Sequence, residues 1–140
     1  MRRFVNPGNA AFEVAVNSQI YVDKTGLLAY TNSVINTKQA LICSSRPRRF
    51  GKSITADMLC AYYSRGCDSD SIFASYEIAK NDSYRKHLNQ YDVIYLDIQW
   101  CMMDAGSAEQ TVSYLNYHVI EELKEIYPQI LLDGIRTAYG

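Results

Sequence analysis

Ser44-Ser45-Arg46-Pro47-Arg48-Arg49-Phe50-Gly51-Lys52-Ser53 is the stretch of sequence that decides the expected fold. It ends in Gly-Lys-Ser, as does the loop that surrounds the phosphates in many nucleotide-binding proteins. The mostly apolar run Ala40–Ser44 comes before it, and a helical pattern begins at Ser53. The order strand, loop, helix is the context that this motif requires, so the pattern predicts a phosphate-binding loop.

The residue types at the end of this stretch suit a nucleoside triphosphate and Mg²⁺. Backbone N–H groups and the dipole at the start of a helix both attract phosphate. Gly51 lets the backbone approach an oxygen, Lys52 would bind the β- and γ-phosphates, and the Ser53 hydroxyl would bind Mg²⁺. We therefore predict ATP and Mg²⁺ as ligands. The residues predicted to hold the nucleotide are Arg46, Pro47, Arg48, Arg49, Phe50, Gly51, Lys52, Ser53 and Ile54.

The loop departs from the standard G-x-x-x-x-G-K-[ST] pattern at its first position. Arg46 stands where the first glycine belongs, and Pro47 biases it toward an extended backbone. In exchange the loop gains guanidinium groups that can form forked hydrogen bonds to phosphate oxygens. The same basic cluster, Arg46–Lys52, leaves open a second hypothesis, a module that contacts the backbone of a nucleic acid. A third hypothesis is a nucleotide-dependent regulator that does not hydrolyse its ligand and signals through residues 109–127.

Several motifs together resemble those of the AAA-ATPase-like family of bacteria and archaea. R-P-R-R-F-G-K-S at 46–53 is similar to that family's phosphate loop, and Tyr21-Val22-Asp23-Lys24-Thr25 resembles its Y-V-D-K-T motif. Weaker matches are Ser71-Ile72-Phe73 and the run at 91–97. The matches occur in the family's order and span about residues 18 to 100.

The resemblance implies a set of expectations about the whole protein. Asp23 and Lys24 would line the nucleotide pocket; the alternative is an exposed acid at the start of a helix beside a solvated lysine. Members are considerably longer, so residues 1–140 would be the N-terminal part of an ATPase domain: a segment at 1–36, then the loop, strand and helices at 37–140. Hydrolysis would belong to the complete protein and this part alone would be inactive. A further C-terminal domain resembling nucleases would bring nucleic acid as a partner.

Asp97 is the one candidate for a second Mg²⁺ ligand. It follows the apolar run Val93–Leu96, as the acid of a Walker B strand does, but Ile98 and Gln99 come next instead of a glutamate. The alternative is an acid that caps or pairs at the end of the strand.

The periodicity of the chain predicts an α/β fold. Ala40–Ser44 and Val93–Ile98 have the continuous apolar character of buried parallel strands. Helices are expected over Ser53–Ser64, where Ile54, Met58, Ala61 and Tyr62 share a face, and over Glu109–Tyr127. A short helix is expected at Ile130–Tyr139. The expected architecture is part of a three-layer α/β/α nucleoside triphosphatase with a mostly parallel sheet.

Composition limits the alternatives. The chain has 140 residues and a formal net charge of −1, so no overall field favours nucleic acid. Its 4 cysteines lack metal-ligand spacing and suggest free thiols in a reducing compartment, with Cys43 and Cys60 packed as small hydrophobes. We expect no membrane span and no signal peptide, and hence a cytoplasmic protein.

Overall fold

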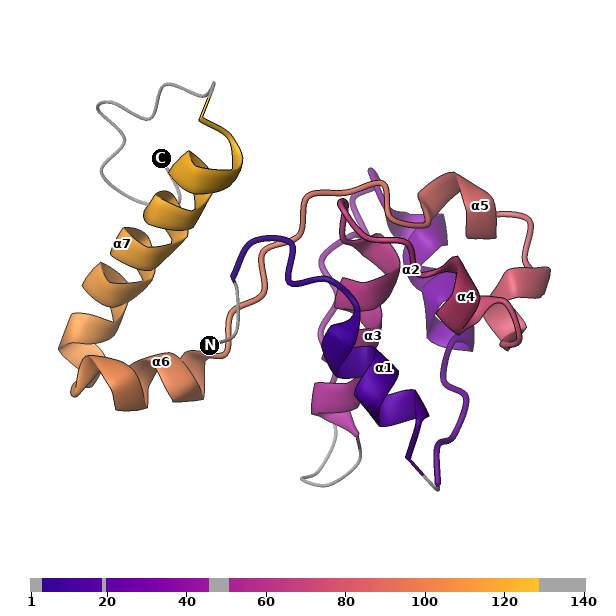
Figure 1. Ribbon diagram of the computed structural model, residues 1–140, viewed down its shortest axis with the longest axis horizontal. Helices are drawn as coiled ribbons and strands as arrows, with labels where there is room; N and C mark the ends of the chain where they lie inside the picture. Colours follow the sequence, from indigo (N-terminus) through magenta and orange to yellow (C-terminus); the bar gives the residue numbers. More distant parts are fainter. Residues whose placement is uncertain (1–3, 19, 46–50, 129–140) are drawn as a thin grey trace. The chain divides into compact units, whose positions relative to one another are not determined.

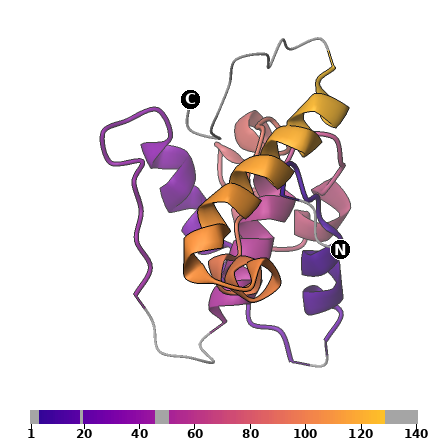
Figure 2. The same cartoon turned by 90° about the vertical axis from the view of Figure 1, so that its left-hand side faces the viewer.

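The computed structural model describes residues 4–18, 20–45 and 51–128. These residues form helices joined by loops, and the chain divides into two compact units. The larger unit comprises residues 6–93, and the smaller unit comprises the remainder on either side. Figures 1 and 2 draw the two units from two directions.

The described residues of the larger unit form six helical elements around one apolar core (Figure 1). They are α1 (Ala10–Val16), α2 (Gly26–Val34), α3 (Lys52–Tyr63), α4 (Asp70–Phe73), the 3-10 helix η1 (Glu77–Lys80) and α5 (Tyr84–His87). The core is built from ten buried residues: Phe12, Leu28, Met58, Ala61, Tyr62, Tyr63, Phe73, Ile78, Tyr84 and Leu88.

Helix α3 is the central element of this core. Its buried face carries Met58, Ala61 and Tyr62, three of the four residues that the sequence pattern placed on one stripe. The Tyr62 ring packs edge-on against Phe73, with 5.5 Å between centroids, and its hydroxyl donates to the Tyr84 backbone oxygen at 2.8 Å. Because aromatic packing and a satisfied hydroxyl coincide at Tyr62, this residue fixes α3 against two later segments.

Among its described residues, the smaller unit contains two helices, α6 (Ile98–Ala105) and α7 (Ala108–Ile126), that meet at a sharp corner (Figure 1). Gly106 makes the corner with a left-handed φ of 84°, and Ser107 caps α7 by accepting from the Gln110 backbone amide. The Glu122 carboxylate accepts from the backbone amides of Phe4 and Val5. The helix expected over 109–127 is confirmed.

The expected parallel sheet is wrong, because the structure describes no strand in any of its ranges. Residues 40–45 have no regular structure, and Leu41 is 96% exposed. In the described part of the chain, no hydrogen bond involves the backbone of Leu41–Ser45. An apolar run indicates burial, but a strand exists only where a neighbouring strand pairs with its backbone groups.

The second expected strand, Val93–Ile98, is divided between two other structures. Ile94 forms an isolated antiparallel bridge with Val5, and the Tyr95 backbone amide donates to the Phe4 oxygen at 2.8 Å. At Ile98 the chain is already helical, as the first residue of α6. The three-layer α/β/α architecture with a mostly parallel sheet is therefore corrected to a helical one over the described residues.

Two smaller expectations concern the cysteines and the helix near the C-terminus. Cys60 is buried as expected, but Cys43 is exposed, because the run that contains it is not packed into a sheet. The helix expected at Ile130–Tyr139 lies outside the described residues. No helix in the described ranges combines the length and the apolar character needed to cross a membrane.

Candidate functional site

The first turn of α3 presents the Gly-Lys-Ser triplet. Gly51 is the N-cap residue and adopts a left-handed backbone, with φ 78° and ψ 25°. A side chain at this φ would be strained, so glycine is the residue that this turn favours. The Gly51 oxygen accepts from both the backbone amide and the hydroxyl of Thr55, each at 2.9 Å. Lys52 and Ser53 therefore open a well-formed helix, and both are exposed.

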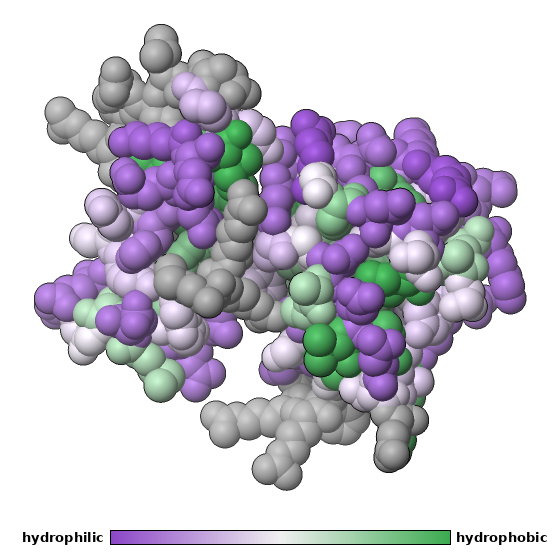
Figure 3. Space-filling view, in the orientation of Figure 1, coloured by the Kyte–Doolittle hydropathy of each residue, from purple (hydrophilic) through white to green (hydrophobic). Residues whose placement is uncertain are grey.

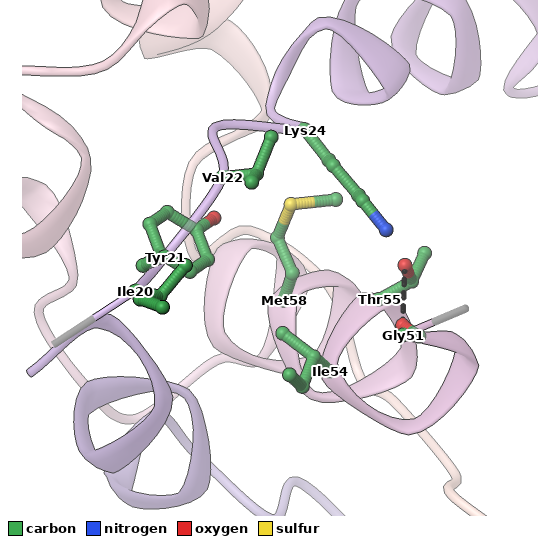
Figure 4. Close-up of a pocket in the computed structure, with 8 residues that line it drawn as sticks. All are labelled: Ile20, Tyr21, Val22, Lys24, Gly51, Ile54, Thr55 and Met58. Atoms are coloured by element: carbon green, nitrogen blue, oxygen red, sulfur yellow. Dashed lines mark hydrogen bonds between the residues drawn. The ribbon is translucent and has the colours of Figure 1, made fainter. Parts of the chain in front are cut away.

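A pocket of about 320 Å³ lies beside these first two turns of α3 (Figure 4). One wall comes from α3 and the other from the segment that carries the Tyr-Val-Asp-Lys-Thr motif. The lining residues are Ile20, Tyr21, Val22, Lys24, Gly51, Ile54, Thr55 and Met58. The volume lies within the range of small-molecule sites in proteins, about 300–1,000 Å³. Figure 3 shows that part of the surface of the larger unit is hydrophobic.

The two ends of the pocket differ in chemistry. Figure 4 shows the Lys24 side chain extending toward Gly51 and Thr55, whereas Tyr21, Ile54 and Met58 form the apolar part. The Lys24 ammonium nitrogen lies 2.9 Å from the position that a Cβ atom on Gly51 would occupy. The cationic end is thus at the helix N-terminus, where the helix dipole also favours an anion.

Asp23 and Thr25, the neighbours of Lys24, hold the motif in place by capping η1. The Asp23 Oδ2 accepts from the Glu77 backbone amide at 3.0 Å, and the Thr25 hydroxyl oxygen accepts from the Ile78 amide at 3.2 Å. Asp23 Oδ1 also accepts from the Thr25 amide and hydroxyl, at 2.8 and 2.6 Å. Thr25 is fully buried. The backbone on both sides of Lys24 is consequently fixed.

The environment of Asp23 favours its charged form. Partial burial pushes the pKa of this carboxyl up, but the hydrogen bonds from Thr25 and Glu77, with the charge of Lys80, outweigh it. The net effect is a pKa below the ordinary value of 3.8. Asp23 is therefore a carboxylate at neutral pH, and its observed contacts are to η1 and Thr25 rather than to the pocket.

Tyr21 supplies the pocket with an aromatic wall and a buried hydroxyl. Its ring packs edge-on against Phe12 and Tyr76, with centroids 5.8 and 5.4 Å apart. Burial, followed by the negative charge of Asp23 and by Tyr76, raises the pKa of Tyr21 to about 12, so the phenol is neutral at physiological pH. No described residue forms a hydrogen bond of normal geometry with this buried hydroxyl, although the Lys24 backbone amide acts to lower its pKa.

The structure brings some of the predicted site residues together and leaves others outside. Lys24, Gly51 and Ile54 line one pocket, and Lys52 and Ser53 follow Gly51 directly. The predicted residues Arg46, Pro47, Arg48, Arg49 and Phe50 lie outside the described residues. Asp97 belongs to the smaller unit, where its carboxylate caps α6 by accepting from the Trp100 amide at 3.0 Å. Over the described ranges, no three His, Cys, Asp or Glu side chains gather as a metal site.

Sequence reasoning missed several of the lining residues. Ile20 and Thr55 were not singled out, and Tyr21 and Val22 were named only as part of the Tyr-Val-Asp-Lys-Thr motif. The Tyr-Val-Asp-Lys-Thr motif could have indicated these lining residues. In it, the polar Asp-Lys-Thr follows an apolar run directly, which predicts a lysine at the edge of an apolar surface. The caps on η1, more than 50 positions later, had no indication in the sequence.

Comparison with known proteins adds a family assignment. The model of the AAA-ATPase-like family, described as "Predicted AAA-ATPase", matches residues 10–133, which is well over half of the chain. The searches among curated proteins and among solved structures found no match.

Proposed function

Because the chain belongs to this predicted AAA-ATPase family, we propose that it binds a nucleoside triphosphate, with ATP and Mg²⁺ as the ligands, where α3 begins. The observation that carries the proposal is the coincidence of Gly51-Lys52-Ser53 at a helix start with a pocket along the same helix. A helix start provides unpaired N–H groups for phosphate, and the pocket provides space for the rest of the nucleotide.

The chemistry of the pocket orients the ligand. The phosphates lie at the end where Gly51 and Lys52 open the helix, and the base lies against Tyr21 and Ile54, which are apolar. Ile54 is 41% exposed, so a flat ring covers apolar surface that water otherwise contacts. This arrangement is the usual division of a small-molecule site into an apolar wall and a few polar anchors.

Mg²⁺ fits the residues at the helix start. The ion prefers oxygen ligands and keeps several waters, so one hydroxyl and the phosphate oxygens suffice to hold it. Ser53, exposed in the first turn of α3, is the residue that would supply the hydroxyl. Bound there, the ion neutralises phosphate charge, and Lys52 supplies a second positive charge from the protein.

We assign binding rather than turnover to these residues. Hydrolysis requires a group that orients the attacking water. None of the described residues that line the pocket is a carboxylate. The alternative of nucleic-acid binding depends on Arg46, Arg48 and Arg49, which lie outside the described residues, so no specific observation favours it.

Calorimetric titration and thermal unfolding of the full 140-residue chain test the proposal. Mg-ATP at a hundred times its dissociation constant should stabilise the protein by about 2.7 kcal/mol. Lys52→Ala should abolish the shift, and Lys38→Ala, which removes an exposed lysine from the same unit, should keep it. Absence of binding in the unmodified chain, or equal binding by Lys52→Ala, would refute the proposal.

A second comparison tests the placement of the base. Ile54→Gln puts a polar, uncharged side chain on the apolar wall of the pocket but leaves the charge at the start of the helix unchanged. This variant should weaken Mg-ATP binding by about tenfold or more, because the amide must be desolvated when the ring binds. Binding of Mg-tripolyphosphate, which has no base, should change less than twofold. Equal losses for the two ligands would place the base elsewhere.

A further inference from the structure

His87 is a buried histidine of the larger unit that the proposed nucleotide site does not use. It is the last residue of α5, and only 7% of its surface is exposed. Its Nδ1 lies 2.6 Å from the Tyr91 hydroxyl oxygen, and the two rings stack with 5.8 Å between their centroids. Histidine is the side chain whose ordinary pKa lies between pH 5 and 8, so a buried histidine can respond to mild acid.

Tyr91 connects this histidine to α3. Its backbone amide donates to the Tyr63 oxygen at 3.0 Å, and its backbone oxygen accepts from the Arg65 amide at 2.8 Å. The Tyr91 ring packs edge-on against the Tyr63 ring, with 5.6 Å between centroids. Both tyrosines line a second pocket of the larger unit, of about 370 Å³. The position of His87 therefore affects one wall of this second pocket through Tyr91.

A positive charge on His87 would have no carboxylate beside it. In the described part of the chain, the contacts of the ring are to Tyr91 and none is to an acid. Burial, followed by the charge of Lys86, lowers the pKa of His87 below its ordinary value of 6.5, so the imidazole is neutral at pH 7.

The other charged groups around α5 do not offset this effect. They lie on α5, on η1, which packs against it, on α3 and in the segments beside Tyr91. Arg85 pairs with Asp70 and Arg65 with Asp92, Glu77, Lys80 and Asp82 are exposed, and Lys52 and Asp57 precede Tyr63 by more than one turn of α3.

Protonation is easier when His87 leaves this place. Because the pKa is lowered in the closed arrangement, an open arrangement in which water reaches the ring binds the proton more readily. The closed arrangement is fully favoured above about pH 6.5, and it loses this advantage as the pH falls below that value. The element that has to move is short, since α5 is the single turn Tyr84–His87.

We propose that the contact between His87 and Tyr91 is a pH-sensitive switch that holds Tyr91 against α3. When His87 takes up a proton, its ring leaves Tyr91, the hydrogen bond from the Tyr91 amide to the Tyr63 oxygen opens, and one wall of the second pocket loosens. This switch is independent of the proposed nucleotide binding, because His87, Tyr91 and Tyr63 do not line the pocket beside Gly51.

Hydrogen exchange of the full chain at pH 7.5 and pH 5.5, read by mass spectrometry of peptides, tests the switch. Rates are divided by the intrinsic rate at each pH, so that the result is a protection factor. Protection of the peptide over residues 88–93 should fall by about three- to tenfold in acid. Tenfold is the limit for one imidazole of ordinary pKa at about one pH unit below that pKa. Peptides from α1 and α2 should change less than twofold.

The 2 histidines of the chain provide a matched pair of variants. His87→Gln keeps a side chain that can accept from the Tyr91 hydroxyl but cannot gain a proton, so its protection over residues 88–93 should change less than twofold between the two pH values. His118→Gln removes the other imidazole, which belongs to the smaller unit, and should keep the full decrease.

Four results would overturn the switch. They are equal protection of residues 88–93 at both pH values in the unmodified chain, an undiminished decrease in His87→Gln, loss of the decrease in His118→Gln, and an equal decrease in the α1 and α2 peptides. The last would mean that acid unfolds the whole unit instead of releasing Tyr91. The His118→Gln result decides the question even if His87→Gln does not fold, because the chain has no third imidazole.

Discussion

Replacing Thr25 by valine tests the anchor that holds the Asp-Lys-Thr motif against η1. The two side chains have nearly the same volume, but valine lacks the hydroxyl. Thr25 is fully buried, and its hydroxyl donates to Asp23 at 2.6 Å while accepting from the Ile78 amide at 3.2 Å. In the variant, the Ile78 N–H would be buried without an acceptor, and Asp23 would lose one donor.

The expected cost follows from these two contacts. A buried amide left without a partner costs about 1–3 kcal/mol, and the lost bond to the partly exposed Asp23 adds about 1 kcal/mol. The free energy of unfolding should therefore fall by about 2–4 kcal/mol. Thr25→Ser keeps the hydroxyl and loses one methyl group, which costs about 1 kcal/mol. Thr111→Val is a second control, because the Thr111 hydroxyl donates to the Ser107 oxygen in the preceding turn of its own helix.

Urea denaturation of the full chain, followed by far-ultraviolet circular dichroism, provides the measurement. The midpoint should move to lower urea with an unchanged slope, since the variant changes stability and not the surface exposed on unfolding. The expected order of destabilisation places Thr25→Val well above both Thr25→Ser and Thr111→Val. A Thr25→Val protein as stable as Thr25→Ser would refute the anchor, because the hydroxyl would then contribute nothing.

Three further predictions concern pH, the aromatic core and the thiols. Asp23 has a lowered pKa, so its contribution to stability is complete above about pH 4 and is lost as the pH falls through the folded-state pKa. Asp23→Asn should therefore have a lower free energy of unfolding than the unmodified chain at neutral pH, and this difference should shrink only in urea titrations at acid pH. Tyr62→Phe should cost about 1–3 kcal/mol in the same assay, because the Tyr84 oxygen loses one of its two donors and the Asn32 amide loses an acceptor inside the core; a smaller loss than that of an exposed Tyr30→Phe control would contradict this. A thiol reagent should modify exposed Cys43 first and buried Cys60 only after denaturation, as peptide mass mapping can show.

The two longest described helices, α3 and α7, were predictable because their signal is local, whereas α6 begins inside a run that was expected to be a strand. Residues 52–63 form α3, and the sequence pattern had placed its buried face correctly at Met58, Ala61 and Tyr62. Ile54, on the same predicted stripe, is instead 41% exposed and lines the pocket. The period of 3.6 residues identifies which side of a helix is apolar, but whether the core or a ligand covers its first turn depends on the rest of the chain.

The strands were not predictable because pairing is not local. Ala40 and Ile42 do contribute to an apolar surface, since they line a pocket of about 370 Å³ with Leu59 and Val93. The apolar character of the run is therefore used in part, without any strand. An apolar run of this length can form a buried strand or an irregular segment with one side packed against the protein. Periodicity does not distinguish these two structures.

The position of Lys24 depends both on its local sequence motif and on segments distant in sequence. The motif supplies the residue types, but η1 supplies the two amides that fix the motif, and η1 begins 53 residues after Lys24. Gly51 then supplies the space that the ammonium uses, again from a distant segment. A substitution at any of the three places should move the same ammonium group. Gly51→Ala should thus combine about 1–2 kcal/mol of backbone strain with displacement of the Lys24 side chain, and urea denaturation beside the unmodified chain measures the loss of stability.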